Sequence, residues 1–206
     1  WDGAFLAHTS GTYKLKFNGI ATLALGLQGG SINNQSYDAG SNTTTADVVL
    51  QGDSSPRLIF TNTQRTASSA KNTGVTNIQL MRPVSEGSTT SYGFDTVFTT
   101  ALENFVHNFQ VIRFMDFTST NGNTESNWSD RVLPQASQGN KGAWEYVIQL
   151  CNETGRDGYI NVPEKATDDY ITHLANLIKY GSDANGNVYT SAQSNPAHAP
   201  LNSNLH

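Results

Sequence analysis

The feature that most constrains the fold is a change in the spacing of apolar residues near Pro83. Before it, apolar and polar residues alternate, as in residues 11–18, where Tyr13, Leu15 and Phe17 share one face. A period of two is typical of a β-strand with one solvent-facing side. After it, apolar residues recur at helical spacing between short apolar runs. The pattern predicts a two-part α+β chain, with a boundary between residues 83 and 84.

The first part, residues 1–83, consists of short strands separated by turn residues. The alternation predicts strands over residues 11–18, 20–25, 45–50, 57–60 and 75–82. Asn18-Gly19 predicts a two-residue hairpin turn between the first two strands, because both residue types tolerate positive φ. Short strands at even spacing, with Gly, Ser and Asn between them, are typical of an antiparallel β-sandwich.

The second part, residues 84–206, alternates helices with strands. The spacing predicts helices and strands in the order helix 97–109, strand 110–117, helix 142–154, strand 159–162 and helix 167–180. This is the order of parallel α/β units. Two parallel strands cannot close a barrel alone. We therefore expect the first (β/α) units of a TIM-barrel-like domain, or a sheet edge that another surface covers.

Composition excludes several classes of protein. A net charge of −5 argues against a nucleic-acid partner, and no apolar run approaches the length of a transmembrane helix. We expect no metal site, because the histidines lack His-x-x-x-His spacing and Cys151 is the single cysteine. No pattern indicates a cofactor.

Abundant hydroxyl and amide side chains are common in secreted proteins, and Ser, Thr and Asn make up close to a third of this chain. Four Asn-x-Ser/Thr sequons begin at Asn34, Asn42, Asn127 and Asn152. They are candidate glycosylation sites and permit an extracellular location without proving it.

Candidate binding residues follow from the predicted parallel strands, since ligands in such folds bind at the carboxyl ends of the strands. An aromatic ring can cover the apolar face of a sugar while amide, carboxylate and guanidinium groups bond its hydroxyls. The residues at these ends predict a saccharide site formed by Asp116, Asn127, Trp128, Arg131 and Asn161.

Each of these residues also has a structural interpretation. Trp128 could pack its own loop, Asp130 and Arg131 could form a local ion pair, and Asp116 could orient other groups. Glu145 is expected at the core edge or on the surface. Arg113 lies in an apolar strand, so we expect it to be buried against an acid.

Six runs of residues together resemble a known family. They are 75–83, 109–116, 127–131, 144–152, 159–163 and 166–170. In this order they resemble large secreted proteins described as cellulose-binding or as glycoside hydrolases, which carry a β-sandwich ahead of a TIM barrel and retain configuration with two glutamates. The resemblance implies the amino-terminal portion of a protein that acts on a β-linked polysaccharide.

This chain departs from that family in one respect. In that family both catalytic glutamates lie further along the chain than the last of the six matching runs. No catalytic residue can therefore be assigned in this sequence. A retaining mechanism needs two carboxylates about 5–5.5 Å apart. The resemblance therefore implies a polysaccharide or oligosaccharide partner, association with a remaining carboxyl-terminal part or another chain, and no complete glycosidase in residues 1–206.

Two other functions stay open. The first is a non-catalytic carbohydrate-binding module, with exposed Tyr13, Tyr37 or Tyr92 as its platforms. The second is an extracellular structural or assembly protein, in which a neighbouring chain covers the edge of the two-stranded parallel sheet.

Overall fold

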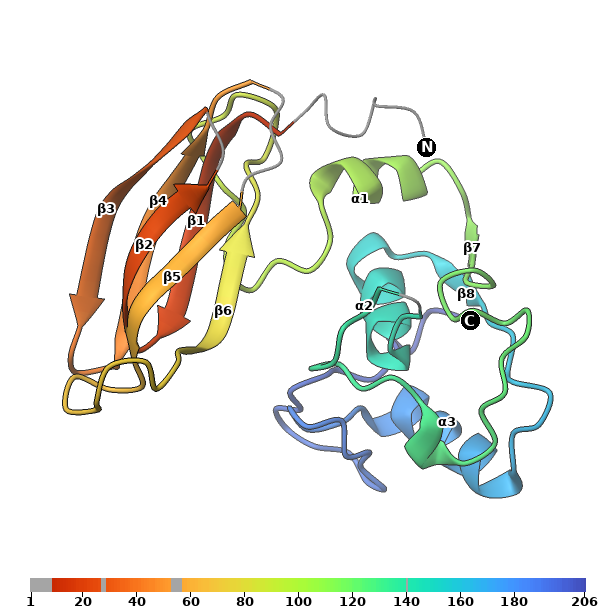
Figure 1. Ribbon diagram of the computed structural model, residues 1–206. Helices are drawn as coiled ribbons and strands as arrows, with labels where there is room; N and C mark the ends of the chain where they lie inside the picture. The colour runs from red at the N-terminus through yellow and green to blue at the C-terminus, as the bar shows by residue number, and fades with distance from the viewer. Residues whose placement is uncertain (1–8, 27–28, 53–56, 140) are drawn as a thin grey trace. The chain divides into compact units, whose positions relative to one another are not determined.

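The computed structural model describes residues 9–26, 29–52, 57–139 and 141–206. Backbone contacts divide the chain into two compact units, with unit 1 ending at Thr99 and unit 2 beginning at Thr100. Residues 84–99 bond to the strands of unit 1, since Thr12 N donates to Ser88 O at 2.8 Å. The described residues form an α+β chain with mostly antiparallel sheets and three α-helices (Figure 1).

Unit 1 contains two antiparallel sheets. The first has four strands in the order β3-β4-β1-β6, and the second pairs β2 with β5. The six strands are β1 (Gly11–Asn18), β2 (Ile20–Gly26), β3 (Gly30–Asp38), β4 (Thr43–Leu50), β5 (Arg57–Gln64) and β6 (Thr76–Met81). The predicted strands are therefore present, with shifted ends, and β3 is an additional one.

The predicted hairpin at Asn18-Gly19 is wrong. β1 pairs with β4 and β6, whereas β2 pairs with β5 in the other sheet. Gly19 has φ +108°, and it carries the chain from one sheet to the other. The reason is burial. Phe17 of β1 and Ala21 of β2 pack in the same core, and two strands can face each other across a core only when they belong to different sheets.

One apolar cluster is shared by the two sheets. Its buried members alternate along the strands as the period of two predicts: Leu15, Phe17, Ala21, Ala46, Val48 and Leu50. The rings of Phe17 and Phe60 meet edge to face, with centroids 5.3 Å apart. Aromatic pairs prefer this geometry, and this one joins β1 to β5 across the core.

An asparagine lies at each irregularity of the described sheets of unit 1. Asn34, Asn62 and Asn77 each have φ +51° and fall where the register of β3, β5 and β6 shifts against the partner strand. Such bulges need a residue that tolerates the left-handed region, and asparagine does so at lower cost than most residues.

Unit 2 combines short helices with one parallel strand pair. Its elements are α1 (Thr100–Val106), β7 (Val111–Arg113), the 3-10 turn η2 (Trp128–Asp130), α2 (Trp144–Thr154), β8 (Asp157–Tyr159) and α3 (Asp168–Tyr180). β7 and β8 pair in parallel from Val111↔Asp157 to Arg113↔Tyr159. The expected parallel pairing is therefore present, over fewer residues than predicted.

The ends of α3 and the carboxyl end of α2 follow the sequence closely, whereas α1 is shorter than the helix predicted over residues 97–109. The Thr167 side chain accepts a hydrogen bond from Tyr170 N at the start of α3. Gly155 follows α2 in the left-handed region, with φ +64°, as expected for a glycine at this position. The ends of α3 and the carboxyl end of α2 lie where short-range patterns place them.

The expectation of buried parallel strands is wrong. Val111 and Tyr159 are each 52% exposed. Arg113 is also exposed, and its guanidinium carbon lies 5.4 Å from the centroid of the Tyr159 ring. No acidic side chain of the described residues forms an ion pair with it. The register places Val111, Arg113 and Tyr159 on one face of the two-stranded sheet. That face is exposed, whereas Ile112 on the other face is half-buried.

Candidate functional site

The segments that follow the two parallel strands are joined to each other. Residues 114–143, the long loop, come after β7, and residues 160–167, the short loop, come after β8. Ser126 Oγ donates to Lys165 O at 3.0 Å, and both the backbone N and the hydroxyl of Thr167 donate to Ser126 O, at 3.0 and 3.1 Å. The carboxyl ends of β7 and β8 thus lead into one region of the surface.

Asn127 and Trp128 lie beside this junction. Asp130 Oδ2 accepts hydrogen bonds from the backbone N of Asn127 at 2.8 Å and of Ser126 at 3.2 Å. These bonds hold the pKa of the Asp130 carboxyl below its ordinary value, because they favour the charged form. Asn127 is exposed and Trp128 is half-buried, so the turn presents an amide and part of an indole ring to solvent.

The Trp128 ring is held by the protein itself. It stacks on His173 with centroids 5.6 Å apart and an interplanar angle of 16°. It meets Tyr170 edge to face at 5.1 Å, and the guanidinium carbon of Arg131 lies 4.3 Å from its centroid. Trp128 therefore packs its loop, as the structural interpretation expected, and its partly exposed edge is what a ligand could contact.

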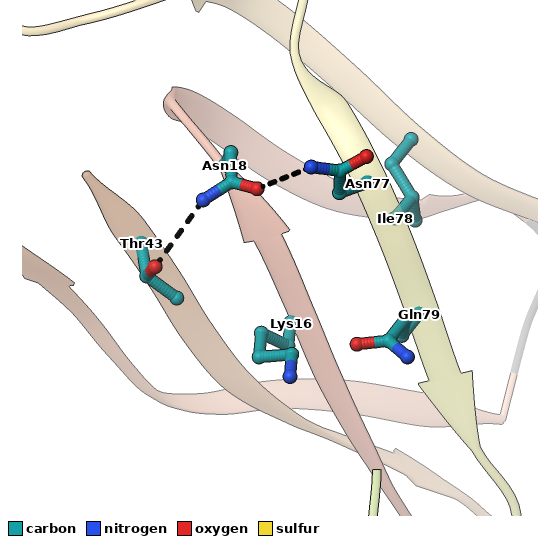
Figure 2. Close-up of a pocket in the computed structure, with 6 residues that line it drawn as sticks. All are labelled: Lys16, Asn18, Thr43, Asn77, Ile78 and Gln79. Carbon is teal, nitrogen blue, oxygen red and sulfur yellow. Dashed lines mark hydrogen bonds between the residues drawn. The ribbon is translucent and has the colours of Figure 1, made fainter. Parts of the chain in front are cut away.

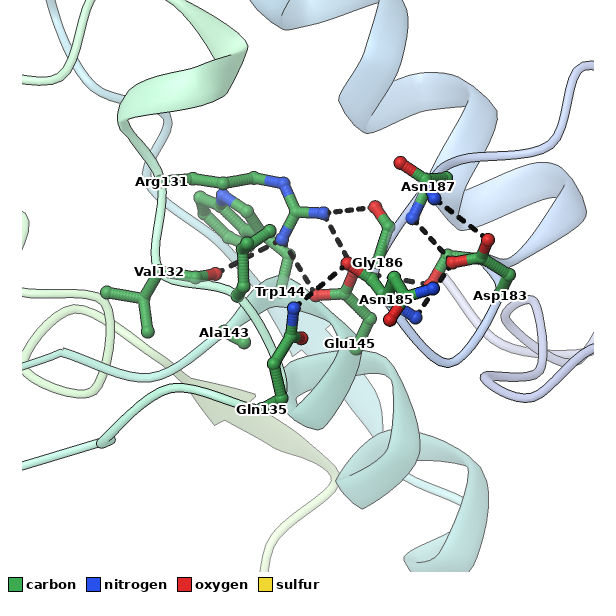
Figure 3. Close-up of polar contacts among 12 residues, drawn as sticks. Arg131, Val132, Gln135, Ala143, Trp144, Glu145, Asp183, Asn185, Gly186 and Asn187 are labelled. Atoms are coloured by element: carbon green, nitrogen blue, oxygen red, sulfur yellow. Dashed lines mark hydrogen bonds and ion pairs between the residues drawn. The ribbon is translucent and has the colours of Figure 1, made fainter.

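Arg131 is buried and ion-paired with Glu145 (Figure 3). Its Nη1 donates to Glu145 Oε2 at 3.1 Å and its Nη2 donates to Oε1 at 3.0 Å, a two-point contact. Nη2 also donates to Gly186 O at 2.6 Å, and Ser182 Oγ donates to Glu145 Oε1 at 3.3 Å. Arg131 thus ties the long loop to α2 and to the segment after α3.

Two expectations about these side chains are wrong. Arg131 does not pair with Asp130, and Glu145 is neither at the core edge nor on the surface, since it is 2% exposed. The ring of neighbouring Trp144 is buried on the same helix. The adjacent Trp144 was the one sequence feature that suggested burial of Glu145. It could not show that Arg131 is the partner of Glu145.

A second buried carboxylate belongs to Glu125. It forms an ion pair with Lys141 at 2.5 Å and accepts a hydrogen bond from the Tyr170 hydroxyl at 2.8 Å. Trp144 Nε1 in turn donates to the Tyr170 oxygen at 2.8 Å. Burial raises the pKa of Tyr170, so the hydroxyl keeps its proton and donates to Glu125. Sequence reasoning missed all four of these residues.

Asp116 and Asn161 lie apart from this network of bonds. Asp116 is exposed, and its backbone O accepts from Ser119 N at 3.1 Å. Asn161 is half-buried, and its buried Oδ1 accepts no hydrogen bond from a described residue. The structure therefore brings Asn127, Trp128 and Arg131 together, and no hydrogen bond between described residues joins Asp116 or Asn161 to them.

The buried carboxylates near the two loops are both ion-paired. Glu125 and Glu145 are the buried glutamates of the described chain, and each is neutralised by a cation. Among the described residues, no group of three or more His, Cys, Asp and Glu side chains is arranged to hold a metal ion. No helix formed by those residues is long and apolar enough to cross a bilayer.

Two of the candidate glycosylation residues are exposed, Asn34 and Asn127, whereas Asn42 is half-buried. Asn152 lies within α2 and is committed to the fold. Its Nδ2 donates to Pro200 O at 2.8 Å and its Oδ1 accepts from Asn202 N at 2.8 Å. The four sequons therefore differ in how exposed their asparagine side chains are and in whether those side chains hydrogen-bond within the protein.

The tyrosines considered as sugar platforms in unit 1 are not fully exposed. Tyr13, Tyr37 and Tyr92 are half-buried, and their hydroxyls donate to Thr9 O, Asn42 Oδ1 and Val84 O. Burial raises the pKa of Tyr13. A polar pocket lies instead on the outer face of β4, β1 and β6 (Figure 2).

Unit 2 has a pocket of a different kind. It measures about 360 Å³ and is lined mainly by apolar side chains of α2 and α3, with Trp144, Cys151 and Leu174 among them. Burial raises the pKa of Cys151 to about 11, so the thiol stays protonated and acts as a small apolar group, as its place on the helical stripe predicts.

Comparisons with protein-family models, curated proteins and solved structures found no match to this chain.

Proposed function

We propose that this chain is the amino-terminal portion of a secreted, carbohydrate-active protein and that it binds a β-linked polysaccharide. The observation that carries the proposal is the junction, at Ser126 and Thr167, of the two loops that follow the carboxyl ends of the parallel strands. Ligands of parallel α/β folds bind at this end. Asn127 and the exposed part of Trp128 are the groups offered there.

The same proposal interprets unit 1 as a β-sandwich and unit 2 as the first (β/α) units of a TIM-barrel-like domain. Two antiparallel sheets with one shared core support the first interpretation. The order β7, α2, β8, α3, with β7 and β8 parallel, supports the second. The resemblance of residues 75–170 to secreted glycoside hydrolases supports both.

Hydrolysis is not part of the proposal for residues 1–206. Retaining glycosidases need one carboxyl group as acid and another as nucleophile, about 5–5.5 Å apart. Glu145 and Glu125 are both held in ion pairs by Arg131 and Lys141. The proposed role of these glutamates is to position the long loop, and the proposed role of that loop is to contact sugar.

Calorimetric titration of the 206-residue chain with soluble glucan, xylan and mannan tests the proposal. Asn127→Ala removes an exposed amide whose own side-chain bond, to Asp130 at 3.4 Å, is long, so affinity should fall without loss of folding. Trp128→Ala should weaken binding by at least about tenfold, or about 1.4 kcal/mol. Phe105→Ala is the control, since Phe105 is an exposed aromatic residue of α1 in the same unit.

Three outcomes would contradict the proposal. One is that no polysaccharide binds to the folded chain. Another is that Asn127→Ala and Trp128→Ala bind as the unmodified chain does. The last is that Phe105→Ala weakens binding as much as they do, because this would place the contact surface away from the two loops.

A further inference from the structure

The pocket on the outer face of unit 1 is built from three neighbouring strands. It measures about 460 Å³, within the range of roughly 300–1,000 Å³ typical of small-molecule sites. Figure 2 shows its lining: Thr43 from β4, Lys16 and Asn18 from β1, and Asn77, Ile78 and Gln79 from β6. It lies in the other unit from the loops discussed above, so it goes beyond the proposed function.

A bulge in β6 creates this pocket. In a regular strand, neighbouring side chains point to opposite faces, yet three consecutive residues of β6 line the pocket. The register of β1 against β6 shifts between Lys16↔Gln79 and Asn18↔Thr76, and Asn77 adopts φ +51° there. The shift re-aims the side chains, as bulges commonly do.

The amides of the pocket are partly committed to each other. Asn77 Nδ2 donates to Asn18 Oδ1 at 2.8 Å, and Asn18 Nδ2 donates to Thr43 Oγ1 at 3.3 Å. Gln79 Nε2 donates to Phe94 O at 3.3 Å. In the described part of the chain no donor reaches Asn77 Oδ1 or Gln79 Oε1, so both oxygens can accept hydrogen bonds from sugar hydroxyls.

Lys16 gives the pocket a positive charge. Its Nζ lies 4.4 Å from the centroid of the Phe94 ring, which holds the ammonium by a cation–π contact. Within the described residues Lys16 forms no ion pair, whereas Lys14, two residues earlier, pairs with Asp47. The lining contains no carboxylate, so an anionic group of a ligand would meet an ammonium that no acid neutralises.

From this arrangement we propose that the pocket binds an acidic oligosaccharide, one whose sugar rings carry carboxylates as well as hydroxyls. The ammonium of Lys16 receives the carboxylate. The amide oxygens of Asn77 and Gln79 accept hydrogen bonds from the hydroxyls. A neutral sugar satisfies the amides and leaves the ammonium without its partner.

The test uses two matched probes on the full chain. One is a β-linked glucuronic acid trisaccharide, and the other is cellotriose, which carries a hydroxymethyl group in place of each carboxylate. By titration calorimetry, the acidic probe should bind at least about tenfold more tightly than cellotriose. Its binding should weaken as sodium chloride rises to about 0.5 M, because salt screens the contact with Lys16.

Two pairs of variants place the contact in the pocket. Lys16→Gln should weaken binding of the acidic probe about tenfold, whereas Lys71→Gln, which makes the same change in net charge on an exposed residue of unit 1, should not. Asn77→Gly keeps the left-handed backbone and removes the amide, so it should weaken binding about threefold. Asn62→Gly makes the same change at the bulge of β5, outside the pocket, and should leave binding unchanged.

The proposal is overturned if the acidic probe does not bind, if Lys16→Gln weakens binding of cellotriose as much as binding of the acidic probe, or if Lys16→Gln binds the acidic probe as the unmodified chain does. Circular dichroism of each variant establishes that unit 1 is folded. The result is separable from the proposed function, because the two sites are tested with different variants: Lys16→Gln reports on the pocket of unit 1, and Asn127→Ala reports on the loops of unit 2. Polysaccharide binding at the loops could equally fail while this pocket binds.

Discussion

The two units of this chain are stabilised in different ways. Unit 1 has an apolar core in which strands alternate buried and exposed residues, with Leu15 and Phe17 fully buried. Unit 2 buries charges: the Arg131–Glu145 pair and the carboxylate of Glu125 lie among its helices. Apolar burial is non-directional, whereas a buried ion pair must keep its geometry to offset the cost of desolvation. Unit 2 also buries apolar side chains, Val147, Cys151 and Leu177 among them. The difference teaches that the ion pairs set among these apolar residues specify one arrangement of the loops of unit 2.

The largest effect is expected from breaking the buried pair. Glu145→Ala leaves the guanidinium of Arg131 buried without its carboxylate, which should destabilise unit 2 by about 3–5 kcal/mol. Urea unfolding followed by tryptophan fluorescence in a Trp1→Phe background measures this, because Trp128 and Trp144 lie in unit 2. Glu153→Ala, an exposed position on the same helix, is the control. A free energy of unfolding unchanged in Glu145→Ala would show that the pair does not organise unit 2.

A cavity in the core of unit 1 is expected to lower the free energy of unfolding by the same amount as Glu145→Ala or by less. Leu15→Ala removes a fully buried side chain and should cost about 2–5 kcal/mol. Leu80→Ala is the matched control, since Leu80 faces Leu15 in the β1–β6 register and is 44% exposed. Far-ultraviolet circular dichroism should report the loss while the tryptophan signal of unit 2 keeps its midpoint. If both midpoints fall together, the units do not unfold separately and the comparison fails.

The smallest effect concerns two half-buried aspartates, Asp47 in unit 1 and Asp183 in unit 2. The side chain and backbone of Asn187 lower the pKa of Asp183, and Lys14 and Asn34 lower that of Asp47. Because both pKa values are lower in the folded protein, each group contributes stability above about pH 4. That contribution is lost as pH falls through the folded pKa.

Carboxyl resonances followed by nuclear magnetic resonance measure these two pKa values directly. Asn187→Ala should raise the pKa of Asp183 and leave that of Asp47 unchanged. An Asp183 midpoint at the ordinary value of about 3.9 in the unmodified chain would count against the hydrogen bonds that Asn187 N and Nδ2 donate to this carboxylate, each at 2.9 Å.

The sequence predicted the helix ends that depend on capping residues close by in the chain. α3 begins at its Thr167 cap and ends before Gly181, and α2 ends before Gly155. β3 was missed because its exposed polar residues do not alternate with apolar ones, and an edge strand can form from backbone pairing to β4 alone. The partner of β1 was mistaken, because a turn motif does not reveal which sheet the next strand joins.

The candidate site was predictable only in part for the same reason. Asn127, Trp128 and Arg131 are neighbours in sequence, so their grouping needs no tertiary information. The partners of Arg131 are Glu145 and Gly186, and these are brought to it by the packing of α2 and of the segment after α3. No spacing rule connects positions so far apart, and Asp116 and Asn161 were grouped with the site on strand ends alone.

The contact of Arg131 with Gly186 also has a consequence for biosynthesis. Position 131 leaves the ribosome well before position 186, and until then the guanidinium lacks one of its acceptors. Partly made domains of this kind expose their interior surfaces during translation, which makes them clients of chaperones. Unit 2 therefore completes its folding only after the loop around Gly186 has emerged, whereas the strands of unit 1 have been synthesised long before.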